Sequence, residues 1–561
     1  MKRTFAVRAA AAAALILVCA PAAAATPPRA AIASAHTLAT QAGFEVLAAG
    51  GNAFDAAVAV ASTLAVVEPQ SSGIGGGGLF LLHRASDGRD VMVDARETAP
   101  AAVAASDYLD ANGEPNRDHS TNGPLSAAIP GEAAGIVWIA EHYGRLPLAK
   151  SLAPAIRIAR EGFAPDSRML GELAGRKDVI ARYPGSKALY LVDGDAPKPG
   201  WTFRTPDLAR VLERIAEHGD DGFYRGETAK ALVDGVRAAG GNWTLEDLSA
   251  YVAKEREPIA FDYRGWHIVT APPPSSGGIA IAEILNILGG YDLGRLDSAH
   301  RVHLTVEAMR RAYRDRAEYL GDPDFVTMPI ARLMSADYAA GLRASIHPEK
   351  ATPSDLLPGY LDTQRGVSTS HFSIIDTQGN LVSATQTVNL VFGSGFVVPG
   401  TGFVLNDEMD DFALVAGKPN AYGLVGNDRN APKPHSRPLS SMSPSFVVGA
   451  DRLAVLGTPG GSSIITMTLE GILAFVDGET PEQFVAKRRY HHQYLPDVVN
   501  AENGAISAAD RATLEAMGHR INEAPGTWPY GFMNAVSWDK KTGEMHAAAD
   551  PRGTSGSGLV K

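Results

Sequence analysis

The chain contains almost no cysteine: Cys19 is the one cysteine among 561 residues. Because Cys19 lies near the N-terminus, the rest of the chain has no disulfide and must be held together by burial. Long hydrophobic runs are also missing. The longest apolar stretch after residue 25, Ala56 to Val67, falls short of the roughly 18–20 residues that a membrane-spanning helix needs. We therefore expect no membrane span.

Positive charge is scarce as well. The chain has 51 Lys and Arg against 62 Asp and Glu, a formal net charge of −11. An acidic chain without basic stripes argues against nucleic acid as a partner. The hydrophobic fraction of 45% is that of a soluble globular protein, which argues against intrinsic disorder.

The first 25 residues have the pattern of a secretory signal peptide. Lys2, Arg3 and Arg8 form a positive start, Ala9 to Cys19 an apolar core, and Ala23 to Ala25 a small-residue cleavage signal. This pattern predicts export, to a periplasm or out of the cell. The remaining residues, 26–561, are enough for one large domain or several ordinary ones.

Hydrophobic periodicity predicts an α/β layered fold, with sheets covered by helices. The predicted helices begin with an Ala-rich segment from Ala35, interrupted at Gly50 to Asn52, and dominate residues 130–321. Residues 348–364 are rich in Pro, Gly and Asp, which predicts an exposed, cleavable segment. The predicted strands are 79–82, 91–94, 370–376, 381–388, 445–448, 453–457, 533–538 and 545–548, with a helix at 464–476.

The most informative position follows the cleavable segment, at the sequence Gly366 to His371. If the chain is cut before Thr369, that residue acquires both a hydroxyl group and a free α-amine. An N-terminal amine can serve as the base that activates its own hydroxyl, and it titrates near pH ~8. From the residues alone, Ser368 and Ser370 compete with Thr369 for this role.

The hairpin that follows fixes the partner of Thr369. If Thr377 to Gly379 form a three-residue loop with Gly379 in the left-handed conformation, Asp376 pairs with Asn380. Counting back along both strands places Thr369 opposite Thr387. Thr387 could relay a hydrogen bond to the nucleophile, or the two could form an ordinary cross-strand pair.

Two glycine-rich segments and a histidine pair could suggest a cofactor or a metal, but none has the required pattern. Gly75 to Gly78 and Gly460-Gly461 lack the Lys-Ser/Thr ending of a phosphate loop, and close backbone packing explains Gly75 to Gly78. His491 and His492 are adjacent, point in different directions and lack a third ligand. We therefore expect neither a cofactor nor a metal.

Eight ordered motifs resemble those of the γ-glutamyltransferase family (glutathione hydrolases), in the N-terminal nucleophile hydrolase superfamily. The resemblance covers the chain from about residue 30 to about residue 552. The motifs are Gly73 to Gly77, Asp94 to Pro100, Pro273 to Gly278, Gly321 to Asp324, Thr369 to Ser373, Asn406 to Phe412, Arg437 to Pro444 and Gly457 to Ser462.

This resemblance implies a four-layer αββα sandwich and an autocatalytic cut between Ser368 and Thr369. A large subunit, residues 26–368, and a small subunit, residues 369–561, would stay together as a heterodimer. Thr369 would be the nucleophile both in self-cleavage and on the substrate.

The resemblance also assigns a pocket for a γ-glutamyl group, which carries a carboxylate and an ammonium. Arg96 is similar to the carboxylate clamp, a task suited to a guanidinium fork; the alternative is an ion pair with Asp94 or Glu97. A γ-glutamyl pocket would further contain two hydroxyl donors, three ammonium acceptors, two oxyanion-hole glycines and a lid loop, 413–435, with its gating residue. By resemblance these are Ser440 and Ser441; Asn389, Glu408 and Asp411; Gly460 and Gly461; and Tyr422. From the residues alone, the serines could instead cap a turn and the acids could form a solvated loop.

The implied activity is cleavage of γ-glutamyl amides such as glutathione. A γ-glutamyl-threonyl ester would form and pass to water or to an amino-acid or peptide acceptor, without a cofactor. Two alternatives remain: a glutaryl-type β-lactam (cephalosporin) acylase of the same superfamily, and a periplasmic binding protein without catalysis.

Overall fold

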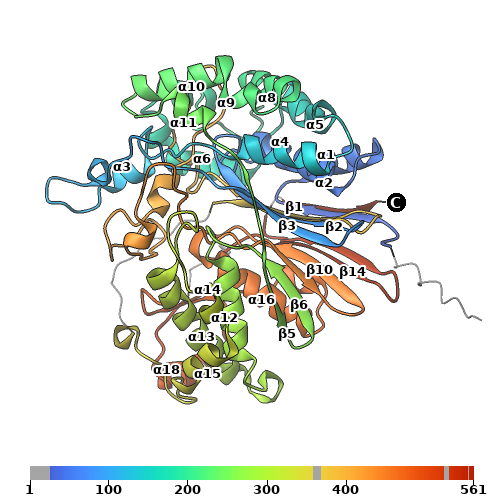
Figure 1. Cartoon of the computed structure of the whole chain (residues 1–561), viewed down its shortest axis with the longest axis vertical. Helices are drawn as coiled ribbons and strands as arrows, with labels where there is room; N and C mark the ends of the chain where they lie inside the picture. Colours follow the sequence, from blue (N-terminus) through green and yellow to red (C-terminus); the bar gives the residue numbers. More distant parts are fainter. Residues whose placement is uncertain (1–25, 358–367, 524–529, 554, 561) are drawn as a thin grey trace, which may run out of the picture.

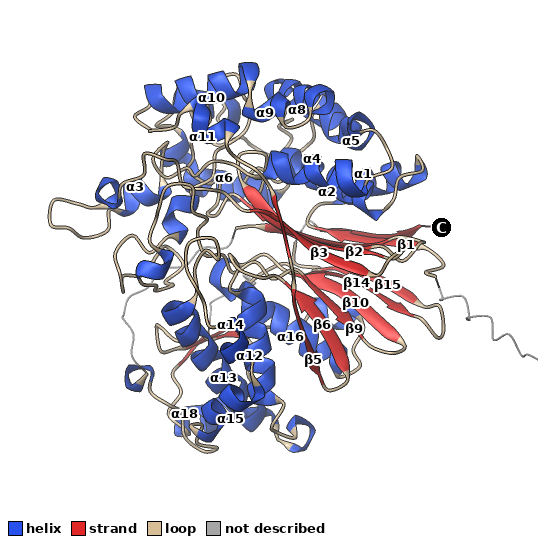
Figure 2. Cartoon of the chain, in the orientation of Figure 1, coloured by secondary structure: helices blue, strands red, loops and turns tan. Residues whose placement is uncertain are grey.

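The computed structural model describes residues 26–357, 368–523, 530–553 and 555–560. The predicted signal peptide and residues 358–364 of the predicted cleavable segment lie outside the described residues. The chain folds into four layers, with two sheets stacked face to face between two layers of helices (Figure 1, Figure 2). This arrangement is the predicted αββα sandwich.

The first sheet has seven strands and contains the predicted nucleophile region. In this sheet the C-terminal strand lies beside the first strand of the chain. In spatial order the strands are β16 (Gly556–Val560), β1 (Ala30–Ser34), β7 (Ser370–Ile375), β8 (Leu381–Thr387), β2 (Gly77–Arg84), β3 (Arg89–Ala95) and β4 (Lys254–Arg256).

The second sheet has six strands and packs against the first. Its order is β15 (Met545–Ala549), β14 (Asn534–Asp539), β10 (Arg452–Gly457), β9 (Ser445–Val448), β6 (Trp266–Thr270) and β5 (Ile259–Tyr263). A small third sheet joins β11 (Tyr490–His491), β12 (Val499–Ala501) and β13 (Ile521–Glu523).

Two groups of helices cover the outer faces of the sheets (Figure 2). Over the seven-stranded sheet lie α1 (Thr37–Ala48), α2 (Ala53–Val67), α3 (Arg117–Thr121), α4 (Glu132–Tyr143), α5 (Leu148–Glu161), α6 (Ser167–Ile180), α7 (Pro184–Tyr190), α8 (Pro206–His218), α9 (Asp221–Tyr224), α10 (Gly226–Ala238) and α11 (Leu245–Ser249). On the other side are α12 (Gly277–Leu288), α13 (Ser298–Tyr319), α14 (Ile330–Leu333), α15 (Ala336–Ala344), α16 (Ile464–Val476), α17 (Pro481–Val485) and α18 (Ala508–Ala516).

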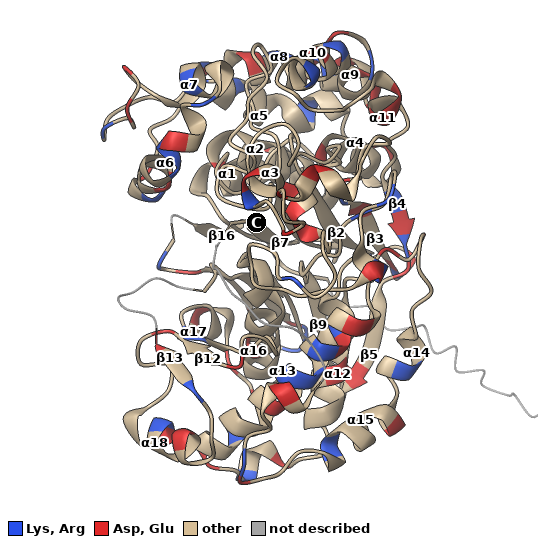
Figure 3. Ribbon diagram, turned by 90° about the vertical axis from the view of Figure 1, so that its left-hand side faces the viewer, with Lys and Arg blue, Asp and Glu red and all other residues tan. Residues whose placement is uncertain are grey.

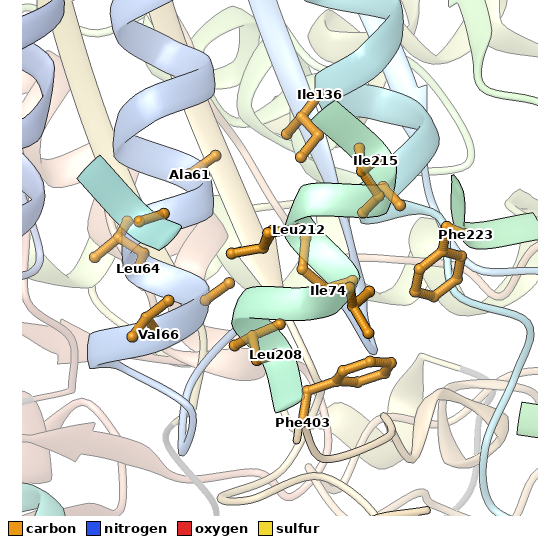
Figure 4. Packing of buried hydrophobic residues seen from close by; sticks show 14 of the residues in the cluster. Ala61, Leu64, Val66, Ile74, Ile136, Leu208, Leu212, Ile215, Phe223 and Phe403 are labelled. Atoms are coloured by element: carbon orange, nitrogen blue, oxygen red, sulfur yellow. The ribbon is translucent and has the colours of Figure 1, made fainter. Parts of the chain in front are cut away.

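Alternation along the strands divides the core between the layers. Phe80 and Leu82 of β2 pack under the first helical layer, whereas Leu79 and Leu81 pack between the two sheets. Successive side chains of a strand point to opposite faces, and β2 is apolar on both faces from Leu79 to Leu82. Figure 4 shows the helix side of this core, where Leu212 and other side chains of α8 meet those of α2 and α4.

Near the N-terminus, a predicted helix break is confirmed and one strand was missed. The predicted helix break at Gly50 to Asn52 is confirmed: the side chain of Asn52 accepts hydrogen bonds from the N–H groups of Phe54 and Asp55 and caps α2. The residues just before the predicted Ala-rich helix, Ala30–Ser34, form β1, which the periodicity did not predict. β1 is buried along its whole length, and an apolar run of this kind cannot be assigned to strand or helix by periodicity.

Residues 130–321 are largely helical, as predicted, but the strands β4, β5 and β6 within them were missed. β5 and β6 pair with each other. These strands form a hairpin whose two-residue turn, Arg264-Gly265, has φ values of 50° and 82°. Positive φ at both turn residues is the geometry that matches the twist of a hairpin. The glycine between two runs rich in aromatic and β-branched residues was the available signal.

The predicted register of the hairpin at the nucleophile is confirmed. Gly379 has a φ of 87°, and the N–H of Asp376 donates to the carbonyl of Asn380. Ser370 pairs with Gln386 across β7 and β8, so the preceding residue, Thr369, faces Thr387 as predicted.

The surface carries charges of both signs, with Lys and Arg interspersed among Asp and Glu on both helical layers (Figure 3). In the described ranges, no helix combines the length and the apolar character that crossing a membrane requires.

Candidate active site

Thr369 lies at the start of β7, with its hydroxyl held by Thr387. The two Oγ1 atoms are 3.0 Å apart, and the N–H of Asn389 donates to Oγ1 of Thr387 over 2.9 Å. Because Thr387 accepts that bond, its own hydrogen is free to point at Oγ1 of Thr369. The cross-strand pair therefore fixes the position of the candidate nucleophile.

The backbone at Thr369 is strained. Its φ is 122°, in a region that a β-branched residue rarely adopts. Strain of this kind typically costs about 1–3 kcal/mol and persists where the surroundings impose it. The strained residue carries the N–H of the Ser368–Thr369 peptide bond.

The two competing serines point elsewhere. The hydroxyl of Ser368 donates to the carbonyl of Gln70 over 2.9 Å, and that of Ser370 donates to Oε2 of Glu68 over 3.1 Å. Thr369, unlike these two serines, lines the pocket that contains Arg96.

This pocket brings together all the predicted site residues except Gly460. Its walls are Arg96, Thr369, Thr387, Asn389, Glu408, Asp411, Tyr422, Leu424, Ser440, Ser441, Met442, Gly461, Ser462 and Ile464. The sequence interpretation missed Leu424, Met442, Ser462 and Ile464. Ser462 directly follows the glycines, and Met442 lies within the predicted serine motif, so proximity to those motifs was the available signal.

Arg96 forms the charged centre of the pocket and is paired with two of the predicted acids. Its Nη2 donates to Oδ2 of Asp411 over 2.6 Å, and its Nη1 lies 2.6 Å from Oε2 of Glu408. The second contact is an ion pair without hydrogen-bond geometry. Glu97, weighed above as an alternative partner, lies farther away, at 3.4 Å.

Acidic groups outnumber the cation in this cluster. Burial, together with Glu97 and Asp411, outweighs the attraction of Arg96 and raises the pKa of Glu408 well above its ordinary value. Burial likewise raises the pKa of Glu97 to about 7. A second cation entering the pocket would favour the ionised forms.

Local structure explains why Glu408 and Asp411 lie together. They occupy the ends of one 3-10 helix, η4 (Glu408–Asp411), as their predicted spacing requires. The amide of Asn406 anchors the start of η4 by donating to the carbonyls of Gly75 and Ala128, both over 2.8 Å.

The glycines of the segment 75–78 let backbones approach closely, as predicted. A β-carbon at Gly75 would lie 2.1 Å from the carbonyl oxygen of Val404, and one at Gly76 would lie 1.9 Å from that of Thr387. This packing places the segment against the end of β8.

The two predicted serines differ in their hydrogen bonding. Oγ of Ser440 accepts from the N–H of Met442 over 3.1 Å. Oγ of Ser441 is buried without a hydrogen-bond partner among the described residues. A buried, unsatisfied hydroxyl costs free energy, so Ser441 offers a donor that a ligand can use.

Gly461 and Tyr422 form one wall. Gly460 and Gly461 have φ values of 145° and 57°, which favour glycine. A β-carbon on Gly461 would lie 2.2 Å from the ring of Tyr422. The hydroxyl of Tyr422 donates to the carbonyl of Asn389 over 2.6 Å, which links this wall to the segment that orients Thr387.

The histidines pair with protein groups. His491 lies 2.8 Å from Oγ1 of Thr466 and His492 lies 3.3 Å from Asp497. Elsewhere in the described residues, His303, Glu307 and His519 could offer three ligand atoms within 4.8 Å of one another. The two imidazoles of that group, however, already share a 2.7 Å hydrogen bond.

The comparisons with known proteins agree with this geometry. The family model for Gamma-glutamyltranspeptidase matches residues 39–560. The chain belongs to the gamma-glutamyltranspeptidase family. This result confirms the family predicted from the motifs and makes the chain an enzyme.

Two curated family members are similar along almost the whole chain. A glutathione hydrolase proenzyme of Pseudomonas sp. (strain A14) is 42% identical, with 94% of this chain and 93% of that protein covered. One from Escherichia coli (strain K12) is 41% identical, with 93% and 90% covered. Among solved structures, a cephalosporin acylase from Bacillus halodurans matches with a TM-score of 0.83 at 28% identity, covering 96% of this chain and 97% of that one.

Proposed function

We propose that this member of the family is exported, cuts itself before Thr369, and then cleaves γ-glutamyl amides such as glutathione. Two similar family members carry the name glutathione hydrolase proenzyme. The observation that carries the proposal is the position of Thr369 in one pocket with Arg96, Glu408 and Asp411.

The charges in the pocket suit an amino-acid head group. A ligand carboxylate would bind Arg96 and take the free hydroxyl of Ser441. The ligand ammonium would then pair with Glu408 and Asp411, which release Arg96 in exchange. Each buried charge keeps a partner in this exchange, so no group is left uncompensated.

In the proposed reaction, Oγ1 of Thr369 attacks the γ-carbonyl carbon while its proton moves to the α-amine of the same residue. The developing oxyanion would be stabilised by the N–H groups of Gly460 and Gly461. The C–N bond then breaks, the leaving amine takes the proton, and a γ-glutamyl-threonyl ester remains. Water or an acceptor amine attacks this ester and regenerates Thr369.

The proposed cut gives a large subunit, 26–368, and a small subunit, 369–561, which remain a heterodimer. The strain at Thr369 supports this site, because breaking the preceding peptide bond removes the restriction on φ. Tyr422, packed on Gly461, is proposed to control access to the pocket as part of a lid loop.

The test is Thr369→Ala, followed by intact-mass analysis and by an assay with γ-glutamyl-p-nitroanilide. We expect an uncut chain without activity, whereas the unaltered protein gives two subunits and turns the substrate over. Two normal subunits from Thr369→Ala would refute the proposal. An uncut, inactive unaltered protein would favour a binding protein instead.

A glutaryl-type acylase is the second candidate, because the matching structure from Bacillus halodurans is a cephalosporin acylase. A glutaryl group lacks the ammonium, so Glu408 and Asp411 would have no positive charge of the ligand to pair with. Faster turnover of a glutaryl analogue than of γ-glutamyl-p-nitroanilide would establish the acylase.

A further inference from the structure

A second polar cluster lies on the other side of β7 from the pocket, and the proposed reaction does not use it. Its centre is Glu68, at the C-terminal end of α2 and 1% exposed. Oε2 of Glu68 accepts from the hydroxyl of Ser370 over 3.1 Å. The hydroxyl of Ser72 also donates to Oγ of Ser370, over 3.1 Å.

The cluster is directly adjacent to the candidate catalytic pair. Ser370 faces Gln386 across the two strands, and Nε2 of Gln386 donates to Oγ of Ser72 over 3.0 Å. The next pair along the strands is Thr369 and Thr387. The two pairs therefore belong to the same hairpin and point to opposite faces of the sheet.

Several hydrogen-bonding atoms of this cluster are unsatisfied. Oε1 of Glu68, both side-chain amide atoms of Gln70 and Oε1 of Gln386 are buried without a hydrogen-bond partner among the described residues. Buried polar groups normally have partners, and three of these atoms, Oε1 of Glu68, Gln70 and Gln386, are acceptors, so a donor is missing.

Cleavage before Thr369 would create such a donor. The chain runs from Ser368, bound to the carbonyl of Gln70, to Ser370, bound to Glu68. The new α-amine of Thr369 would lie between these two contacts. It would carry more N–H donors than the single N–H of the peptide bond it replaces.

The charged groups that face Glu68 come from α6 and its N-cap. Nη1 of Arg168 lies 3.8 Å from Oε1 of Glu68, and Glu172 and Asp166 oppose its ionisation. Burial, only partly offset by Arg168, raises the pKa of Glu68 to about 7. β7 contributes the neutral hydroxyl of Ser370, and Gln386 of β8 reaches the cluster through Ser72.

We propose that Glu68 is a positioning residue that stabilises the protonated α-amine of Thr369 and thereby sets the lower pH limit of activity. The proposal rests on the function proposed above. A negative neighbour favours the cationic form of an amine, but the neutral amine is the form that accepts the proton of Oγ1. Ionised Glu68 therefore orders the new N-terminus and moves the onset of activity to higher pH.

Glu68→Gln tests this role, because glutamine keeps the size and the acceptor but not the charge. The measurement is the pH dependence of kcat and kcat/KM with γ-glutamyl-p-nitroanilide. A charge within about 4–6 Å shifts a pKa by about 1–3 units. Because Glu68 acts through Ser370, we expect a shift at the lower end of this range. The acid limb of the profile, where activity rises with pH, should move to lower pH by about one unit.

Glu172→Gln is the opposing variant, since Glu172 binds Arg168 over 3.0 Å and its negative charge raises the pKa of Glu68. Without that charge more of Glu68 is ionised, so we expect the acid limb to move in the opposite direction, to higher pH. A purely structural role of Glu68 would lower kcat at every pH without moving the limb, and that outcome would overturn the proposal.

Ser370→Ala provides a second measurement if Glu68→Gln is not cut into subunits. Without the hydroxyl, the pKa of Glu68 rises further, less carboxylate is present, and the limb moves in the same direction by about half a unit. An unmoved limb overturns the inference. An unaltered protein that is uncut or inactive would instead overturn the proposed function itself.

Discussion

Glu307 and Glu408 are both fully buried glutamates beside arginines, yet their pKa values move in opposite directions. Around Glu307 on α13, burial is outweighed by Arg310, Arg311 and the N–H of Thr352, and the pKa is lowered. Around Glu408 in the pocket, burial outweighs Arg96, and the pKa is raised.

The difference lies in how completely each cluster satisfies its members. Glu307 accepts from Nη1 of Arg311 over 2.7 Å and from Thr352 over 3.0 Å, and Arg310 also binds Ser354. In the pocket, Glu408 and Asp411 share Arg96, and Asn420 also donates to Asp411 over 3.0 Å. Both carboxylate oxygens of Glu408 and Oγ of Ser441, however, have no hydrogen-bond partner among the described residues. A completed cluster stabilises the fold, whereas an incomplete one is suited to a ligand.

The largest expected effect comes from breaking the completed cluster with Glu307→Gln. Removing one partner of a buried ion pair typically costs about 3–5 kcal/mol, so we expect a clearly lower Tm at unchanged KM. The contribution of Glu307 is present above its unfolded pKa of about 4.3 and is lost as the pH falls through its lowered folded pKa.

Thermal unfolding at neutral pH, together with a KM measurement, checks this prediction. The control is Glu227→Gln, whose ion pair with Arg214 is exposed and should contribute less than about 1 kcal/mol. Equal Tm values for the two variants would remove the contrast between the clusters.

Arg96→Lys should have the opposite pattern. Lysine keeps the charge but loses the two-pronged geometry that binds a carboxylate. We expect kcat/KM for γ-glutamyl-p-nitroanilide to fall by about a hundredfold, about 2.7 kcal/mol, with a small change in Tm. A large loss of Tm at unaltered kcat/KM would assign Arg96 to the fold instead.

Glu408→Gln tests the incomplete cluster through the pH dependence of ligand binding. Ligand ammonium favours the carboxylate, so binding below the raised pKa of Glu408 must release a proton. We expect the affinity for L-glutamate to weaken as the pH falls through that pKa, by up to about tenfold per pH unit. In the glutamine variant this dependence should flatten. The measurement is the inhibition constant of L-glutamate against pH for both proteins. Parallel pH profiles of the two proteins would exclude Glu408 as the titrating group.

The smallest effect is expected for Ser441→Ala. A hydrogen bond to a charged ligand group is worth about 1.5–3 kcal/mol; Ser441 shares the carboxylate with Arg96, so we expect KM to rise by about five- to tenfold. Ser354→Ala, in the completed cluster, should leave KM unchanged and lower Tm. If both variants change KM alike, the distinction between the clusters is lost.

Local patterns made much of the hairpin and the site predictable. Gly379 determined the loop, the loop determined the register, and the register placed Thr387 opposite Thr369. The pairing of Arg96 with Glu408 and Asp411 was not predictable in the same way. It joins β3 to η4 across more than 300 positions of the chain, and no local periodicity reports such a contact.

β1 was missed because its local pattern is ambiguous. β1 consists mainly of alanine and is buried on both faces, so it lacks the alternation that marks a half-exposed strand. Glu68 lies at the end of a helix, and its local sequence indicates no distant partner. Its contact with Ser370 became visible only once α2 and β7 were packed together.

The order of the seven-stranded sheet has a consequence for the molecule after the proposed cut. β7 and β8 lie between β1 and β2, and β1 lies between β16 and β7, so strands from both sides of Thr369 alternate. Neither subunit would contain the complete sheet, so separating the two subunits would unfold both. We therefore expect the cut protein to survive dilution as a single chain does, while its recovery from denaturant becomes dependent on concentration.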